Sequence, residues 1–325
     1  MCTAVSFKTK DHYFGRNLDL EFSFGEGVTV CPRNFPFVYR NKPTDESHYT
    51  MIGMATIANE YPLFYDATNE KGLSMAGLNF PKNAFYSKKT EGKDNIATFE
   101  FIPWILSQCK NVEEAEKLCE RINLTDELFN NEFPESTLHW IIADREKSIT
   151  VEAMRDGLHI YENPVGVLTN NPPFPIQLFQ LNNFRHLSTT TRQNSFSEKL
   201  NLDDYSRGMG GIGLPGDLSS SSRFVRACFT KLNSICDESE SASISQFFHI
   251  LAAVAQQKGL CFVEHSGMYE FTIYSSCVNT DKGIYYYRTY ENSTISAVDM
   301  HRENLDGKEL IQYAVLTEQN IDWKN

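Results

Sequence analysis

The residue with the clearest chemical potential stands second in the chain. Cys2 directly follows Met1, so removal of Met1 would leave one residue with both a thiol and a free α-amine. A free thiol is only a few per cent thiolate at neutral pH, and an α-amine with a pKa of about 8 can exchange protons with it. Cys2 can therefore supply both a nucleophile and a base. The competing interpretation is an ordinary cysteine near a disordered terminus.

The segment that follows Cys2 has the composition of a β-hairpin. Residues 3–8 and 13–19 are rich in β-branched, aromatic and apolar side chains, and the polar residues between them suit a turn. If the turn is centred near Lys10, the numbers of paired residues sum to about 20, which places Cys2 beside Leu18.

Arg16 and Asp19 belong to the second strand of this hairpin and would lie close to the thiol. A cation beside a thiol lowers its pKa, and a carboxylate can hold an α-amine through a hydrogen bond. A surface ion pair is the alternative, but the aromatic and apolar neighbours of the two residues argue against a solvated position. The hairpin therefore predicts a nucleophile with a charged pair beside it.

Three further polar residues stand at the ends of expected elements. Asn79 falls at the end of an apolar run at 72–80, Asn170 lies in the proline-rich loop TNNPPFP, and Arg223 lies in the first turn of an expected helix at 219–235. Turn formation is the ordinary role of such asparagines. An amide can also stabilise an oxyanion, and an arginine at a helix N-terminus favours an anion.

Motifs along nearly the whole chain resemble those of the choloylglycine hydrolases, which are N-terminal-nucleophile amidases, and the bile salt hydrolase branch is the most similar. The matching segments are MCT at 1–3, FGRNLD at 14–19, NEKGL at 69–73, AGLNFP at 76–81, GVLTNNP at 166–172 and GLPGDLSSSSRF at 213–224. The resemblance implies a catalytic set whose residue types are all present here: Cys2, Arg16, Asp19, Asn79, Asn170 and Arg223.

The expected elements agree with the fold that this resemblance implies. Strands at 51–58 and 72–80 are expected to pair across a turn at 67–72. Helices are expected at 95–109, 111–122, 219–235 and 243–259. Blocks of helices and antiparallel strands suit an α+β fold, an αββα sandwich of two antiparallel sheets covered by helices. No linker or repeat divides the chain, so we expect one domain over residues 1–325 with Cys2 as its mature N-terminus.

The composition argues against several other function classes. The chain has 325 residues and a net charge of −12, whereas a nucleic-acid-binding surface needs a basic stripe. Its eight cysteines form no C-x-x-C pair, so neither a metal nor an organic cofactor is expected. No basic leader is visible and no run approaches about 18 apolar residues, which favours a cytoplasmic protein that binds no membrane. The resemblance also implies a homotetramer.

The resemblance implies hydrolysis of the amide bond of glycine- or taurine-conjugated bile salts. The thiolate of Cys2 would attack the carbonyl, Asn170 and the surroundings of Asn79 would stabilise the oxyanion, and the α-amine would move the proton. A penicillin V acylase is the alternative within the superfamily, although tyrosine usually matches Asn79 there. A non-catalytic binder of amphipathic anions is the alternative from another class. A Cys–His pair is not supported, because no thiol-protease motif surrounds the candidate histidines His12, His139 and His249.

The resemblance further implies the residues that contact the substrate. A steroid needs a broad apolar wall, and the side chains that would form it are Leu18, Phe22, Phe24, Tyr65, Phe129 and Phe133. Several of these can equally be core aromatics. Ser206 and Arg207 match a segment that is linked to taurine preference in related enzymes, and a guanidinium can donate several hydrogen bonds to a sulfonate.

Overall fold

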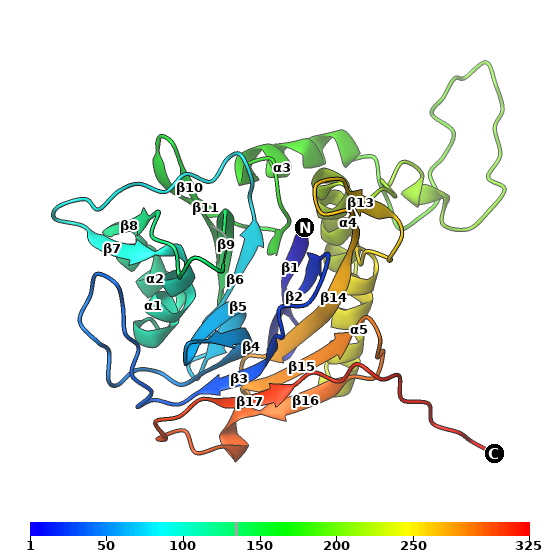
Figure 1. Ribbon diagram of the computed structural model, residues 1–325. Coiled ribbons are helices and arrows are strands. Elements are labelled where there is room, and N and C mark those ends of the chain that lie inside the picture. Colours follow the sequence, from blue (N-terminus) through cyan, green and yellow to red (C-terminus); the bar gives the residue numbers. More distant parts are fainter. Residues whose placement is uncertain (134–135) are drawn as a thin grey trace.

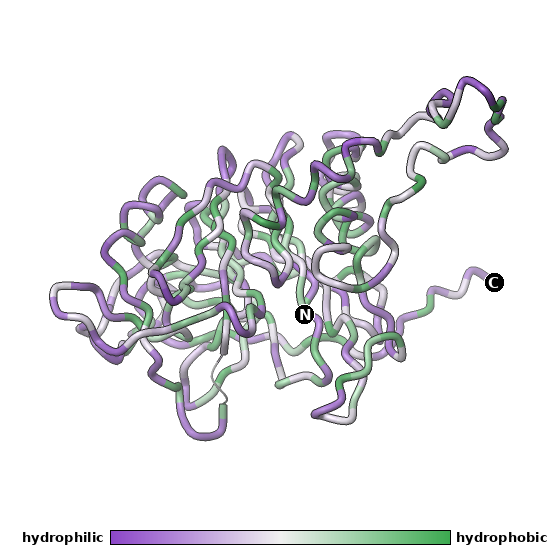
Figure 2. Tube along the Cα trace, turned by 90° about the horizontal axis from the view of Figure 1, so that it is seen from above, coloured by the Kyte–Doolittle hydropathy of each residue, from purple (hydrophilic) through white to green (hydrophobic). Residues whose placement is uncertain are grey.

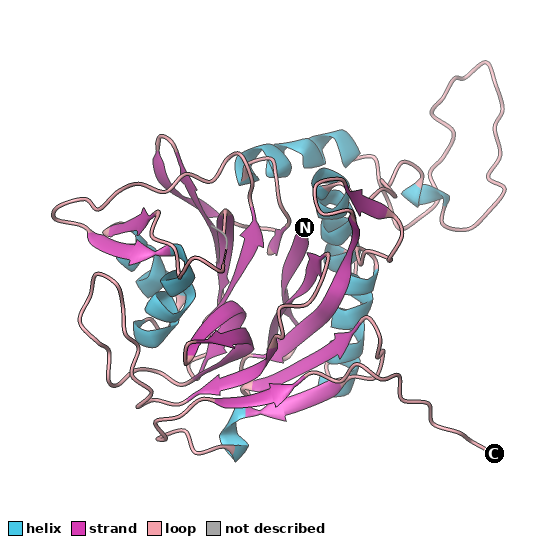
Figure 3. Cartoon of the chain, in the orientation of Figure 1, coloured by secondary structure: helices cyan, strands magenta, loops and turns pink. Residues whose placement is uncertain are grey.

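The computed structural model describes residues 1–133 and 136–325 and shows two large antiparallel sheets packed face to face (Figures 1 and 3). In the described residues the first sheet has the strand order β12-β1-β2-β14-β15-β16, with β13 added beside β14. Its strands are β1 (Cys2–Lys8), β2 (His12–Leu20), β12 (Val167–Leu168), β13 (Cys261–Val263), β14 (Met268–Asn279), β15 (Ile284–Thr289) and β16 (Ser296–Asp299).

The second sheet has the order β11-β10-β9-β6-β5-β4-β3-β17. Its strands are β3 (Gly27–Cys31), β4 (Met51–Ala58), β5 (Tyr61–Asn69), β6 (Ser74–Asn79), β9 (Leu138–Ala143), β10 (Ser148–Met154), β11 (Gly157–Glu162) and β17 (Ile311–Ala314). A small parallel pair, β7 (Asp94–Ala97) and β8 (Ile122–Thr125), lies beside it.

Helices cover the outer face of each sheet (Figure 1). α4 and α5 pack against strands of the first sheet, and α1 and α2 pack against strands of the second. The helices are α1 (Phe101–Gln108), α2 (Val112–Cys119), α3 (Phe174–Gln180), α4 (Ser220–Leu232) and α5 (Glu240–Ala252), and the 3-10 helices are η1 (Thr98–Glu100), η2 (Leu181–Phe184), η3 (Met209–Gly211) and η4 (Met300–Arg302). The αββα sandwich expected from the sequence is therefore confirmed.

The interior has two apolar clusters, one on each side of the second sheet. The inner cluster joins side chains of the first sheet, such as Phe14 and Val278, to Met54 of the second. The outer cluster joins Trp140 of the second sheet to Phe101 of α1. Because both faces of the central strands are covered, their sequences are apolar runs rather than alternating patterns.

The predicted hairpin is confirmed in its register. Cys2 pairs with Leu18 and Lys8 pairs with His12, so a turn centred near Lys10 was the correct expectation. The predicted pairing of the next two strands was wrong. Residues 51–58 and 72–80 do not pair with each other, because an additional strand, β5, lies between them and pairs with both. β5 carries Pro62 and Asp66, residue types that are depleted in strands.

Two helix boundaries also differ from expectation. The segment 95–109 begins as strand β7 and becomes helical only at Thr98, where the Glu100 side chain accepts a hydrogen bond from Ala97 N at 2.9 Å. This bond from the third helical residue back to the residue before the helix fixes where the helix begins. The helix expected at 243–259 spans Glu240–Ala252, because Ser239 caps its N-terminus and Gly259 lies well beyond its end.

Candidate active site

The start of β1 places Cys2 between the two sheets, close to the residues expected around it. Its side chain is only 3% exposed, and its backbone nitrogen donates to Oδ1 of Asn170 at 2.9 Å. Met1 precedes it, and the Met1 ammonium donates to the carbonyl oxygen of Asp19 at 2.8 Å and pairs with Oε2 of Glu270 at 2.7 Å. An ammonium group therefore has a defined binding place one residue before the thiol.

Arg223 in the first turn of α4 connects Cys2 with Asn170. Its Nη1 donates to the carbonyl oxygen of Cys2 at 2.5 Å and to Oγ1 of Thr3 at 2.7 Å, and its Nη2 donates to Oδ1 of Asn170 at 2.6 Å. Burial lowers the pKa of this guanidinium, and the nearby Asp19 carboxylate opposes that shift. Arg223 therefore fixes the backbone of Cys2 and the amide of Asn170 in one network.

Asp19 faces the same place from the end of β2. Oδ1 accepts from the Thr272 hydroxyl at 2.6 Å, and Oδ2 accepts from Nε2 of Gln256 at 3.3 Å and lies 3.9 Å from Arg223. The side chain is fully buried. A buried carboxylate with these donors can hold an α-ammonium group once Met1 has been removed.

Arg16 spans the space between the two sheets. Its Nη1 donates to the carbonyl oxygens of Tyr65 and Gly77, at 2.9 and 2.6 Å, and its buried Nη2 makes no hydrogen bond to the described residues. Although burial works against the charge, the neighbouring Cys2 thiol and the Asp66 carboxylate raise the pKa of Arg16. The guanidinium therefore remains a permanent positive charge near the nucleophile.

Asn79 and Asn170 are brought together at the ends of β6 and β12. Nδ2 of Asn170 donates to the carbonyl oxygen of Asn79 at 2.7 Å, which leaves its second hydrogen for another acceptor. The side chain of Asn79 is exposed, and its Oδ1 accepts from the Thr137 hydroxyl at 3.2 Å. Asn170 thus links the backbone at the end of β6 to Cys2.

The expected apolar wall divides into two groups. Leu18 and Tyr65 belong to the inner core cluster. The remaining aromatics form a continuous row, because ring centroids are 4.8 Å apart for Phe22 and Phe24, 6.4 Å for Phe24 and Phe133, and 5.8 Å for Phe129 and Phe133. Phe22 and Phe24 are 46% and 37% exposed, so this row presents an apolar surface to solvent.

Ser206 and Arg207 lie apart from the other predicted residues. Both are exposed, on a long segment between η2 and α4 that projects from the body of the molecule (Figure 1). Figure 2 shows the same projection from above, with hydrophilic and hydrophobic stretches in succession. Within one chain, the structure does not bring these two side chains to Cys2.

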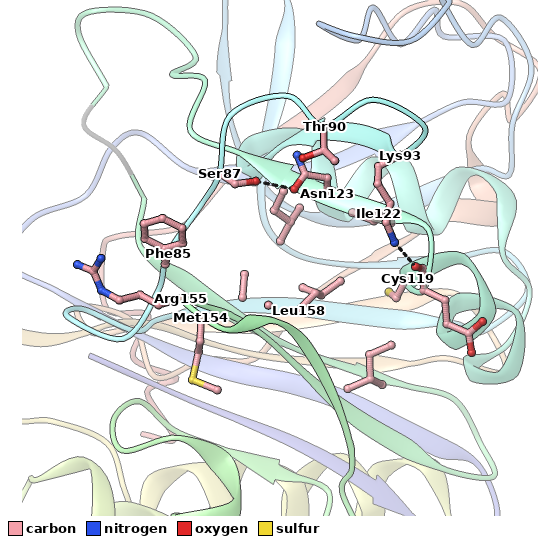
Figure 4. A pocket seen from close by; sticks show the side chains of 15 residues that line it. Phe85, Ser87, Thr90, Lys93, Cys119, Ile122, Asn123, Met154, Arg155 and Leu158 are labelled. Carbon is pink, nitrogen blue, oxygen red and sulfur yellow. Dashed lines mark hydrogen bonds between the residues drawn. The ribbon is translucent and has the colours of Figure 1, made fainter.

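A cavity of about 510 Å³ lies away from the predicted site residues (Figure 4). Residues of α2, β8, β10 and β11 line it, among them Cys119 and Leu158, together with Phe85. None of the predicted site residues lines it. Within residues 1–133 and 136–325 no cluster of metal-ligating side chains occurs, and no helix is long and apolar enough to span a membrane.

Sequence reasoning missed several residues that contact the predicted set. Thr272 and Gln256 hold Asp19, Thr3 accepts from Arg223, and Glu270 binds the Met1 ammonium. The sequence could have indicated Thr3, because Thr3 directly follows Cys2. The other three lie more than 200 residues away along the chain, and no spacing pattern relates them to Cys2.

Comparison with known proteins assigns the family. The model of the linear amide C–N hydrolases, choloylglycine hydrolase family, matches residues 2–313. A bile salt hydrolase/transferase from Lactiplantibacillus plantarum is 56% identical over 318 residues, covering 98% of each chain, and one from Clostridium perfringens is 42% identical over 324 residues, covering 96% of each.

Solved structures agree with this assignment. A mutant of the conjugated bile acid hydrolase from Clostridium perfringens superposes with a TM-score of 0.93 at 39% identity, covering 100% of both chains. A penicillin V acylase from Agrobacterium tumefaciens shares the fold, with a TM-score of 0.75 at 19% identity, covering 96% of this chain and 90% of the acylase. This chain therefore belongs to the choloylglycine hydrolase family of linear amide C–N hydrolases.

Proposed function

We propose that this chain hydrolyses the amide bond of glycine- or taurine-conjugated bile salts and releases the free bile acid and the amine. The observation that carries the proposal is the bonded network in which Arg223 and Asn170 hold Cys2 next to the buried Asp19. The names of the similar enzymes from Lactiplantibacillus plantarum and Clostridium perfringens support the choice of substrate.

The proposed mechanism uses only residues of this chain. After removal of Met1, the Cys2 thiol passes its proton to its own α-amine, and the sulfur attacks the substrate carbonyl. Nδ2 of Asn170 and a donor near Asn79 stabilise the oxyanion. Collapse of this intermediate breaks the C–N bond, and the leaving amine takes the proton from the α-ammonium. Water, deprotonated by the α-amine, then hydrolyses the thioester.

The aromatic row is proposed as the steroid-binding wall. The rings from Phe22 to Phe133 offer an apolar surface with few polar atoms, which suits a rigid, largely apolar acyl group. Leu18 and Tyr65 are proposed to support this wall from the core side.

We propose that Ser206 and Arg207 give the enzyme a preference for taurine conjugates. Their position on the projecting segment means that they can contact a conjugate only if the segment closes over the site or lies against another copy of the chain. The second arrangement agrees with the proposed homotetramer, since the segment carries Phe196 and Tyr205 with exposed fractions of 80% and 84%. A cytoplasmic location is also proposed, because all eight cysteines are free thiols.

The direct test is to measure taurine and glycine released from taurocholate and glycocholate by the purified chain. We expect release of both amines, and we expect Cys2→Ser to lose most of the rate because a serine hydroxyl ionises far less readily than a thiol. Binding of the conjugates without amine release would favour the binder of amphipathic anions. Faster cleavage of penicillin V than of either conjugate would favour the acylase alternative.

A further inference from the structure

A fully buried acid–histidine pair lies next to the asparagine that the mechanism uses. His139 is on β9 and Glu152 on β10, and Nδ1 of His139 lies 2.9 Å from Oε1 of Glu152. Nε2 of His139 lies 2.9 Å from the carbonyl oxygen of Thr169, the residue before Asn170. The pair thus reaches the backbone of the proposed oxyanion site, although it contacts neither Cys2 nor the substrate space.

The partners of the ring determine where its protons lie. A backbone carbonyl can only accept, so Nε2 must carry a hydrogen toward Thr169. Oε1 of Glu152 also accepts from the backbone nitrogen of Phe174, at 3.0 Å, at the start of α3. One hydrogen between Nδ1 and Oε1, together with the hydrogen on Nε2, satisfies all three contacts at once.

Other bonds hold the same backbone from the remaining directions. The Asn170 nitrogen donates to Oγ of Ser220 at 2.8 Å, and Nε2 of Gln177 donates to the Asn170 carbonyl oxygen. The His139 ring also stacks on Phe80, with centroids 4.2 Å apart and ring planes 6° apart. Because Phe80 directly follows Asn79, a single imidazole ring contacts both segments that supply the proposed oxyanion donors.

We propose that His139 and Glu152 form a positioning pair for the oxyanion site. The pair orients the Thr169 carbonyl, and through it the amide of Asn170, and it fixes the end of β6 through Phe80. This inference rests on the proposed function, because it takes Asn170 as an oxyanion donor. A donor displaced by a fraction of an ångström still binds substrate but stabilises the transition state less well.

The decisive variant is Glu152→Gln, because a glutamine cannot satisfy all three contacts. If its amide oxygen accepts from Phe174, a neutral His139 has one ring hydrogen for two acceptors. If the glutamine amide nitrogen instead donates to Nδ1 of His139, the amide nitrogen also faces the Phe174 N–H, and two donors then point at each other. We expect kcat for taurocholate to fall by about 10- to 100-fold while KM changes by less than about threefold.

The rate at which iodoacetamide alkylates Cys2 shows whether a variant has lost the reactivity of the thiol itself or only the positioning of the oxyanion site. Alkylation forms no oxyanion, so its rate constant in Glu152→Gln should stay within about twofold of the natural chain. His139→Phe keeps a ring on Phe80 but removes both ring nitrogens. We expect the same result as for Glu152→Gln, a lower kcat with an almost unchanged alkylation rate. Alkylation at Cys2 is followed on its own peptide by mass spectrometry, because seven other free thiols can react, and circular dichroism checks that both variants are folded.

Glu100→Gln is the matched control, because Glu100 is also a buried carboxylate that accepts from backbone nitrogens, those of Ala97 and Arg40. It should lower thermal stability without changing kcat. An unchanged kcat in the two test variants, or equal losses of kcat and of the alkylation rate, would overturn the positioning role. If the natural chain itself releases no amine, the proposed function fails instead.

Discussion

At the scale of single residues, the proposed mechanism makes the action of Cys2 depend on removal of Met1. With Met1 in place, the nitrogen of Cys2 belongs to an amide, which neither titrates nor accepts a proton near neutral pH. The Met1 ammonium then lies close to the thiol, held by Glu270 and the Asp19 carbonyl oxygen. Burial raises the pKa of Glu270, and the Met1 ammonium opposes that shift. Removal of Met1 takes this particular ammonium away from the carboxylate.

We therefore predict that a chain with an uncleavable N-terminal extension loses at least about 100-fold in kcat/KM for taurocholate, because the α-amine that moves the proton is missing. The matched control carries the same extension after Asn325, at the end that projects from the body in Figure 1. Intact-mass spectrometry must show Met1 absent from the active control. Full activity in a chain that keeps Met1 would exclude the α-amine as the base.

The aromatic row gives a second prediction at this scale. Phe129→Ala and Phe133→Ala should each raise KM for conjugated bile salts by about 10-fold, with kcat little changed, because burying a large apolar side chain against a ligand contributes about 1.5–3 kcal/mol. Phe85→Ala is the control, since Phe85 lines the cavity away from the catalytic residues. If KM stays the same in both variants, the steroid must bind elsewhere.

At the scale of elements, the β1–β2 hairpin brings a second buried histidine into the fold. The ring of His12 lies between the hydroxyls of Ser6 and Thr280, each 2.9 Å away. Burial lowers the pKa of His12 from its ordinary 6.5 to about 4, against the opposing effects of Asp281 and Asp144. In the unfolded chain the same histidine takes up a proton at a pH near 6.5, so between these two values the unfolded state binds more protons.

Stability should therefore fall as the pH falls from about 6.5 to about 4, and His12 should account for about 3 kcal/mol of that loss. We predict that His12→Gln flattens the dependence of the unfolding free energy on pH in this window. Urea unfolding at pH 4.5 and at pH 7 measures the difference, and the exposed His301→Gln is the control. The same slope in His12→Gln and in the natural chain would show that other groups carry the acid sensitivity.

The hairpin also shows how far sequence could predict the fold. Its register followed from a single turn position, because paired residues on either side of a turn have a constant sum. β5 was missed because Pro62 and Asp66 resemble turn residues, yet the Asp66 carboxylate accepts from the Tyr274 and Tyr285 hydroxyls of the first sheet, each at 2.7 Å. Partners so far apart in sequence leave no local signal.

The predicted site residues show the same limit. Resemblance to the family supplied Asn79, Asn170 and Arg223, and the structure brings all three to the start of β1. The supporting residues, among them His139 and Thr272, depend on contacts that exist only after the sheets have packed. No composition or spacing rule could have selected them.

At the scale of the whole molecule, we propose that the projecting segment forms part of the contact between copies of the chain. The exposed rings of Phe196 and Tyr205 would be costly to leave in water over a long segment, so we propose that they are covered in the tetramer. Phe196→Ser combined with Tyr205→Ser should give smaller assemblies in light scattering. An unchanged mass would show that the tetramer, if formed, uses another surface.

Arg207 lies on the same segment, so its effect on specificity depends on how that segment packs. A solvent-exposed ion pair changes a rate by less than about fivefold, whereas a pair closed off from water can exceed tenfold. We predict that Arg207→Thr lowers the ratio of kcat/KM for taurocholate to that for glycocholate, by less than about fivefold if the segment stays in water. Arg192→Thr, on the same segment, is the control.

The size of the change identifies the arrangement. A larger fall that disappears in the dissociated Phe196→Ser, Tyr205→Ser variant would mean that Arg207 reaches the site of a neighbouring copy. A fall that persists in the dissociated variant would mean that the segment closes over the site of its own chain. An equal ratio for the natural chain and Arg207→Thr would remove this arginine from the choice of conjugate and leave the role of Cys2 untouched.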